Sequence, residues 1–206
     1  MIEHRGLDFW FAIGSTYSFL TVQRIDKIAS HNGIAVRWRP FNLRTITREM
    51  NNSPFAGKPV KAAYMWRDIQ RRAQMYGLTA SVPAPYPIAE YDLANLVAVL
   101  GMREGWGPAY IKETYRRWFV DGEEPGSEPN LSSSLKTVVP DPARVLAVAR
   151  TEEVVAELTV TTNEARRLGI FGSPSFTVGG EIFWGDDRLE EAVYWRKHGT
   201  LARPSS

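Results

Sequence analysis

Two short segments at opposite ends of the chain, IGSTYS (13–18) and GIFGSPSF (169–176), decide the fold. The first follows the apolar run LDFWFAI, which is short enough for a buried strand, and it opens a helical pattern. The second places Pro174 between two apolar stretches, just before another strand-like run. A serine hydroxyl and free backbone N–H groups at the helix start would meet the proline turn if these segments lie together.

The composition is that of an ordinary globular protein. The chain has 206 residues, 44% hydrophobic and 23% charged, so we expect one compact unit or one domain with an insertion. Its formal net charge of +2 argues against a dedicated nucleic-acid binder. No apolar run approaches the roughly 20 residues of a membrane span, and residues 1–7 lack the apolar stretch of a signal peptide. We therefore expect a cytoplasmic protein that contacts neither nucleic acid nor membrane.

The chain contains no cysteine, which excludes several kinds of chemistry. Disulfides, thiolate metal sites and a cysteine nucleophile all require that residue. The three histidines, His4, His31 and His198, are far apart in sequence and lack metal-ligand spacing, so no metal site is expected. Any sulfur chemistry must come from a bound ligand, and a disulfide oxidoreductase is excluded.

Hydrophobic periodicity predicts the order of the elements. Strands joined by a helix form a right-handed βαβ unit at the N-terminal end, and a helix, a hairpin and a last helix close the chain. The predicted ranges are a strand over 7–13, a helix over 16–30, a strand over 34–41, a helix over 152–168, strands over 175–178 and 181–184, and a helix over 187–198. This order predicts an α/β, thioredoxin-like fold that is interrupted after its second strand.

The interruption is predicted to be a largely α-helical insertion. Helical patterns cover 61–76, 88–105 and 106–119, and a short helix should follow Asp141. Residues 43–59 and 121–142 are rich in turn-forming residues and read as connectors. The expected domains are therefore a thioredoxin-like unit, 1–44 plus 151–206, and an insertion, 45–150.

Ser15 and the Ser173–Pro174 pair are candidate halves of one thiol-binding site. A serine at a helix start is typical of a helix cap, but its hydroxyl can also donate to a thiolate that the helix dipole favours. An X–Pro pair before a strand is usually a plain turn, whereas a cis bond would leave the N–H and C=O of Ser173 free to pair with an extended peptide. For each residue the sequence leaves both interpretations open.

The stretch WGDDRL (184–189) offers paired carboxylates where a helix starts. Asp is a common helix cap, but such a pair could also hold the α-ammonium of an amino-acid-like ligand. On an insertion helix, Lys61, Tyr64, Asp68 and Arg71 share one face by their spacing, which is typical of an exposed, salt-bridged stripe.

These motifs resemble those of one family. The chain resembles the 2-hydroxychromene-2-carboxylate isomerases and their relatives, the kappa-class glutathione transferases, in the DsbA-like branch of thioredoxin folds. The resemblance covers nearly the whole length. The matching stretches are FWFAIGSTYSFL (9–20), Pro40 with Phe41, Asn52 with Pro54, the K-x-x-Y-x-x-x-D-x-x-R run (61–71), residues 169–175 and FWGDDRL (183–189), the last two being the most specific.

The resemblance implies glutathione as cofactor, bound in a cleft between the thioredoxin part and the insertion. Ser15 matches the catalytic serine that hydrogen-bonds the glutathione sulfur and keeps it ionised, with Thr16 and Tyr17 beside it. Ser173 matches the residue before the cis-proline, here Pro174, whose backbone pairs with the cysteinyl unit.

The same resemblance implies contacts for the two ends of the tripeptide. Asp186 and Asp187 match the pair that holds the γ-glutamyl end, in a loop shaped by Trp184 and Gly185. Two positions on the insertion would also reach glutathione, Asn52 and Lys61. A lysine there suits the glycyl carboxylate electrostatically.

Four positions depart from the family pattern. Thr16 replaces the usual proline, Ser173 stands where valine is frequent, and Asp186 stands where serine or asparagine is common. Arg44 replaces a small residue, and it is either a site for an acidic second substrate or a plain surface arginine.

The leading hypothesis is a glutathione-dependent isomerase of the 2-hydroxychromene-2-carboxylate type. The thiolate would add reversibly to a conjugated double bond of an aromatic hydroxy or keto acid, and rotation and elimination would follow. The alternatives are a kappa-like glutathione transferase and a non-catalytic, thioredoxin-like glutathione-binding protein. Family habit also predicts a homodimer.

Overall fold

The computed structural model describes residues 6–52, 54, 55 and 57–202. These form one mixed sheet with the strand order β2-β1-β3-β4. The strands are β1 (Leu7–Phe11), β2 (Val36–Pro40), β3 (Ser175–Val178) and β4 (Glu181–Trp184). β1 pairs parallel with β2, and β3 pairs antiparallel with both β1 and β4. The expectations for residues 1–5, that they form no signal peptide and that His4 binds no metal, lie outside the described residues.

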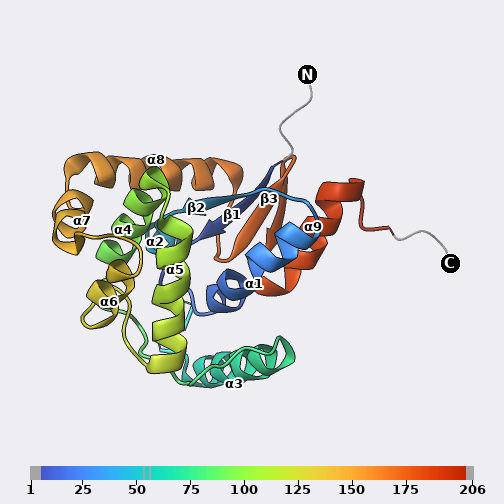
Figure 1. Ribbon diagram of the computed structural model, residues 1–206. Coiled ribbons are helices and arrows are strands. Elements are labelled where there is room, and N and C mark those ends of the chain that lie inside the picture. Colours follow the sequence, from blue (N-terminus) through green and yellow to red (C-terminus); the bar gives the residue numbers. More distant parts are fainter. Residues whose placement is uncertain (1–5, 53, 56, 203–206) are drawn as a thin grey trace.

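Helices cover both faces of the sheet. Helices α1 (Ser18–His31) and α9 (Leu189–His198) lie on one face, and α8 (Glu152–Leu168) runs along the other, where α2 (Leu43–Glu49) also packs (Figure 1). The rest of the chain adds α3 (Pro59–Met75), α4 (Tyr91–Glu104), α5 (Gly107–Arg116), a π-helical turn (Arg117–Asp121), α6 (Asn130–Lys136), α7 (Pro142–Ala149) and a 3₁₀ turn (Asp186–Arg188). The thioredoxin-like α/β fold predicted from the sequence is confirmed.

The apolar composition of β1 explains its central place. The ring of Phe9 stacks between those of Phe11 and Phe176, at centroid distances of 5.2 and 5.6 Å. Trp10 points to the opposite face and packs edge-on against Phe41. Apart from Asp8, all residues of β1 are fully buried, as expected for a strand that is covered on both faces.

Several predicted elements match the structure residue by residue, and others do not. The helix over 152–168 and the hairpin strands over 175–178 and 181–184 are confirmed, and Gly169 ends α8 at a φ of +82°. The first helix begins at Ser18 rather than at residue 16. The expectation that 43–59 and 121–142 are connectors is wrong in part, because each contains a seven-residue helix, α2 and α6. Both are too short for periodicity to reveal them.

The buried core runs without interruption from the sheet into the insertion. One cluster of buried apolar side chains includes Phe9 of β1, Leu100 of α4, Tyr115 of α5 and Val145 of α7. The division of the chain at residues 45 and 150 therefore stays a prediction, since packing alone draws no boundary there.

Candidate active site

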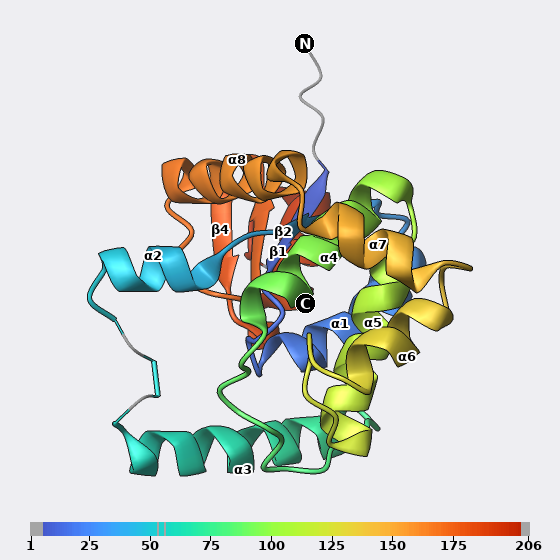
Figure 2. The same cartoon turned by 90° about the vertical axis from the view of Figure 1, so that its left-hand side faces the viewer.

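Four chain segments meet at one edge of the sheet, the edge that is formed by the ends of the strands and not by an outer strand. β1, β2 and β4 end at this edge and β3 begins there, because β3 runs antiparallel to its two neighbours. The edge thus collects residues 12–17, 41–44, 172–174 and 184–187, which hold most of the predicted site residues. Helix α3 lies beneath these segments in Figure 2.

Ser15 and Ser173, which are 158 positions apart, are in direct contact. The Oγ of Ser15 donates a hydrogen bond of 2.6 Å to the carbonyl oxygen of Ser173. The Oγ of Ser173 accepts from the N–H of Ala12 at 3.0 Å and lies 2.8 Å from the Oγ of Ser18. The Ser173–Pro174 peptide bond is cis. The two halves inferred from the sequence are therefore adjacent, but the carbonyl of Ser173, expected to be free, is already bonded to Ser15.

Ser15 does not cap the first helix. Helix α1 begins at Ser18, three residues later, with Tyr17 in the N-cap position and no side-chain capping bond. The N–H groups of Thr16 and Tyr17 have no acceptor among the described residues. The capping interpretation of Ser15 is thus wrong. A partly buried hydroxyl and two unpaired N–H groups precede the positive end of the helix dipole.

Two buried side chains of the insertion hold this turn in place. Asn95 of α4 accepts from the N–H of Ile13 at 2.8 Å and donates to its carbonyl at 2.9 Å. Tyr115 of α5 donates to the carbonyl of Ala12 at 2.9 Å, and its hydroxyl lies 3.2 Å from the carbonyl of Ser15. Neither residue was among the site residues predicted from the sequence. A polar residue inside the apolar run of α4 was the available signal for Asn95.

Helix α3 docks on the start of α1 through one stripe of side chains. Met65 accepts a hydrogen bond from the buried hydroxyl of Thr16 at 3.0 Å, and Asp68 accepts from the hydroxyl of Tyr17 at 3.1 Å. Burial, and then the charge of Asp68, raise the pKa of Tyr17, so this hydroxyl stays protonated. Lys61 is exposed, one turn before Met65 on the same helix. It is the next position along the stripe.

The buried Asp186 is the centre of a partly buried ionic cluster, which we call the Asp186 cluster. It comprises Asp186, Thr21, Arg24, Arg72, Tyr76 and Glu190. The side chain of Asp186 is 1% exposed, and its carboxylate accepts hydrogen bonds from Thr21 and Arg24 at 3.0 Å and from Arg72 at 3.1 Å. Burial lowers the pKa of Arg24, but the charges of Asp186 and Glu190 outweigh this effect and raise the pKa above its ordinary value.

Asp187, the neighbour of this buried residue, is exposed. Gly185 lies two residues before it, with a φ of +116°, a conformation that favours glycine. The N–H of Gly185 donates to the carbonyl of Pro174 at 2.9 Å. Trp184 is 54% exposed and lies edge-on against the partly exposed Phe171, at a centroid distance of 4.8 Å. The loop after β4 is therefore tied to the proline turn and presents Asp187 and Trp184 to solvent.

Arg44 and Asn52 lie on the arm that joins β2 to α3. Arg44 is partly buried, donates to the carbonyl of Ile88 at 2.7 Å and lies 4.1 Å from the centre of the Tyr91 ring. It is therefore anchored, and its role in binding an acidic substrate stays a prediction. Asn52 is exposed, and its backbone N–H donates to Thr47.

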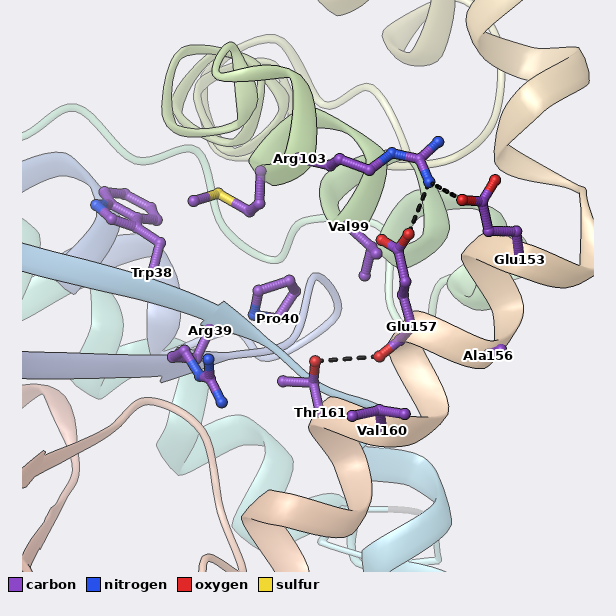
Figure 3. A pocket seen from close by; sticks show the side chains of 11 residues that line it. Trp38, Arg39, Pro40, Val99, Arg103, Glu153, Ala156, Glu157, Val160 and Thr161 are labelled. Carbon is purple, nitrogen blue, oxygen red and sulfur yellow. Dashed lines mark hydrogen bonds and ion pairs between the residues drawn. The ribbon is translucent and has the colours of Figure 1, made fainter.

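The surface has two grooves to consider, one beside the predicted site residue Lys61 and one away from the predicted site. One, of about 580 Å³, is lined by Lys58, Pro59, Val60, Lys61 and Tyr64 at the start of α3. The other, of about 590 Å³, lies between α4, α8 and the outer edge of β2, where Arg103 pairs with Glu153 and Glu157 (Figure 3). Only the first contains a predicted site residue, Lys61. Neither contains Ser15.

Residues 6–52, 54, 55 and 57–202 contain no group of three or more His, Asp or Glu side chains placed to hold a metal ion. None of the helices in these ranges combines the length and the apolar content that a bilayer crossing requires.

The whole site falls within one recognised domain. The model of the DSBA-like thioredoxin domain matches residues 6–194. The chain belongs to the DSBA-like thioredoxin domain family. Ser15, the Ser173–Pro174 turn and the loop after β4 all lie within these matched residues.

Two relatives and one solved structure show which kinds of protein this chain is similar to. The chain is 25% identical over 186 residues to a 2-hydroxychromene-2-carboxylate isomerase of Sphingobium xenophagum, covering 89% of this chain and 94% of that protein. It is 24% identical over 196 residues to glutathione S-transferase kappa 1 of Caenorhabditis elegans, covering 89% and 87%. The solved structure of a 2-hydroxychromene-2-carboxylate isomerase superposes with a TM-score of 0.80 at 25% identity, over 96% of this chain and 99% of that one.

Proposed function

We propose that this DSBA-like protein binds glutathione and uses its thiolate as the nucleophile of an isomerase of the 2-hydroxychromene-2-carboxylate type. The observation that carries the proposal is the contact between Ser15 and Ser173, which brings a hydroxyl, unpaired N–H groups and the proline turn to one point. The names of the similar proteins, and the large share of each chain that the similarity covers, support the same activity.

The side chains and backbone groups at the site fit the tripeptide. The Ser15 hydroxyl and the N–H groups of Thr16 and Tyr17 suit a thiolate. The N–H of Ser173, which has no acceptor among the described residues, suits the backbone of a cysteinyl unit. The exposed ammonium of Lys61 and the exposed carboxylate of Asp187 suit the glycyl carboxylate and the γ-glutamyl ammonium. Asn52 and Trp184 stay candidate contacts.

Bound glutathione would supply a thiolate that adds reversibly to a conjugated double bond of an aromatic hydroxy or keto acid. To stabilise that sulfur, the Ser15 hydroxyl turns away from the carbonyl of Ser173, which costs one hydrogen bond and gains a stronger, charge-assisted one. The end of the α1 dipole adds to this stabilisation. Arg44 lies at the same edge of the sheet, held by Ile88, where it can attract an acidic substrate.

A kappa-like transferase would use the same groups at the sulfur. It differs in what happens to the adduct, which is released rather than returned to an isomer. A glutathione-binding protein without turnover is the third candidate, motivated by Thr16 and Asp186 in place of the usual family residues. Pairing of two copies stays a prediction from family resemblance.

Calorimetric titration with glutathione tests the proposal, together with assays on aryl α-keto acids and simple electrophiles. We expect the wild type to bind and Ser15→Ala to lose roughly a hundredfold in turnover, because it lacks one preorganised donor. Ser30→Ala, which changes an exposed serine of α1, is the matched control and should behave as wild type. Failure of the wild type to bind glutathione would overturn the proposal. Binding without turnover would favour the non-catalytic protein.

A further inference from the structure

Two neighbouring carboxylates occupy opposite environments in the loop after β4. The side chain of Asp186 is 1% exposed, whereas that of Asp187 is 49% exposed. The two oxygens of Asp186 are divided between elements: Oδ1 accepts from Thr21 and Arg24 of α1, and Oδ2 accepts from Arg72 of α3. A carboxylate held in this way is poorly placed to receive an incoming ammonium group.

The Asp186 cluster continues into the end of α3. Arg72 also donates to the hydroxyl of Tyr76 at 3.0 Å, and the guanidinium carbon of Arg24 lies 3.5 Å from the centre of the Tyr76 ring. Arg24 reaches Glu190 on α9 at 2.6 Å. The two arginines and two carboxylates make the cluster formally neutral. It joins α1, α3, α9 and the loop after β4.

The position of Arg72 on α3 links the Asp186 cluster to Lys61, which lies on the same stripe of that helix. Met65, Asp68 and Arg72 form the stripe by which α3 contacts the rest of the site, and Lys61 continues that stripe by one turn. The first two turns of α3 carry Val60 and Tyr64, which are 84% and 61% exposed, and Lys61 itself lies 5.4 Å from the centre of the Phe55 ring, so little buried packing holds that end. The direction in which Lys61 lies therefore depends on the part of α3 that is anchored, which runs from the buried Met65 to Arg72.

We propose that Asp186 is a positioning residue that fixes α3 through Arg72 and thereby holds Lys61 over the site, leaving Asp187 alone to bind the ligand's ammonium. The ligand part of this inference rests on the proposed function. The clamp itself does not. Asp186→Asn replaces one of the two carboxylate oxygens by an NH2 donor, so the side chain can no longer accept from both arginines in this arrangement, and an unbalanced positive charge is left in the cluster.

Binding of three ligands separates the two carboxylates. The ligands are glutathione, its analogue without the α-amino group, and its analogue with an amidated glycyl carboxylate. In the wild type each deletion should weaken binding about tenfold or more, because each removes a charge-assisted contact. In Asp187→Asn, loss of the amino group should cost nothing further, while amidation keeps its full effect.

Asp186→Asn should show the reverse pattern. Loss of the amino group keeps its full cost, and amidation costs little because Lys61 is no longer held in place. Arg72→Gln should reproduce this pattern, and it carries the test if Asp186→Asn does not fold. An Asp186→Asn protein for which the amino group no longer matters would overturn the proposal, since Asp186 would then be a direct ligand.

Hydrogen exchange without ligand tests the clamp independently. Amides in the C-terminal half of α3 should exchange about tenfold faster in Asp186→Asn and Arg72→Gln than in the wild type, while those of α8 should not change. Asp187→Asn is the matched control and should leave α3 unchanged. Exchange in α3 that stays at the wild-type rate in both Asp186→Asn and Arg72→Gln would overturn the proposal. Faster exchange in a protein that binds no glutathione would keep the clamp and remove the proposed function.

Discussion

Asn95 illustrates how a single side chain positions the reactive turn. Its amide satisfies both backbone groups of Ile13, two residues before Ser15, from a helix that is 82 positions away in sequence. The residue is fully buried among apolar neighbours of α4. Since no other group among the described residues bonds the backbone of Ile13 in this way, the conformation of the chain after β1 depends on that amide.

Asn95→Ala should therefore be strongly destabilising. It leaves the N–H and the C=O of Ile13 buried without partners, which we expect to cost about 2–4 kcal/mol. Urea unfolding measures the change. Asn163→Ala is the matched control, because Asn163 is also helical but exposed, and its cost should stay below about 0.5 kcal/mol. Equal effects of the two substitutions would contradict the role given to Asn95.

The sequence indicated Ser15 and Pro174 but not the residues that support them. Local motifs showed where a strand meets a helix and where a proline precedes a strand. The contacts of Asn95, Tyr115 and Arg72 depend on how distant helices pack, and no local pattern encodes that. The same limit explains Asp186, whose motif indicated a ligand contact and whose burial places it between two arginines.

At the scale of elements, long amphipathic segments were predictable and short polar ones were not. The bounds of α8 were predicted although Thr159 and Thr162 lower helix propensity. Their hydroxyls donate back to the carbonyls of Val155 and Leu158 at 2.9 and 2.7 Å, which keeps these polar groups bonded within the helix. Helix α2 begins with a different signal, the side chain of Asn42, which accepts from the N–H of Thr45.

The end of α5 should make stability depend on pH. The guanidinium of Arg116 donates two hydrogen bonds of 2.9 Å to Glu113, which lowers the pKa of that carboxyl. A lowered folded-state pKa stabilises the protein above the ordinary carboxyl value of about 4.3, and this contribution is lost as the pH falls through the lowered value. We expect about 0.5–1 kcal/mol, since the pair is partly exposed.

Thermal unfolding from pH 6 to pH 3 measures this contribution. Glu113→Gln should flatten the part of the pH dependence that the pair supplies, and Arg116→Gln should do the same from the other side. A pH dependence that neither substitution alters would show that the ion pair does not stabilise the fold.

At the scale of the whole molecule, the sheet and the insertion share one core. Buried side chains are continuous from β1 through α4 and α5 to α7. Two parts that share a core lose much of their packing if either unfolds, so they should unfold together. The sequence suggested two units because its pattern changes from strands and helices to loop-rich and helical segments. Such a change does not reveal whether the two units share a core.

We therefore predict a single cooperative transition. Urea unfolding followed by far-ultraviolet circular dichroism, which reports mainly the helices, should coincide with unfolding followed by tryptophan fluorescence. The tryptophans suit this comparison, because Trp10 lies in the sheet and Trp118 in the insertion, both fully buried. Two separated transitions would instead support independent domains at 1–44 plus 151–206 and 45–150.

The most direct test of the account is the ionisation of bound glutathione, followed by the ultraviolet absorbance of the thiolate as the pH is varied. Bound to the wild type, the thiol should have a pKa well below the ordinary value of about 8.5. Ser15→Ala should raise that pKa by about one to two pH units, because one charge-assisted hydrogen bond is lost. An identical titration in both proteins would contradict the claim that Ser15 stabilises the thiolate.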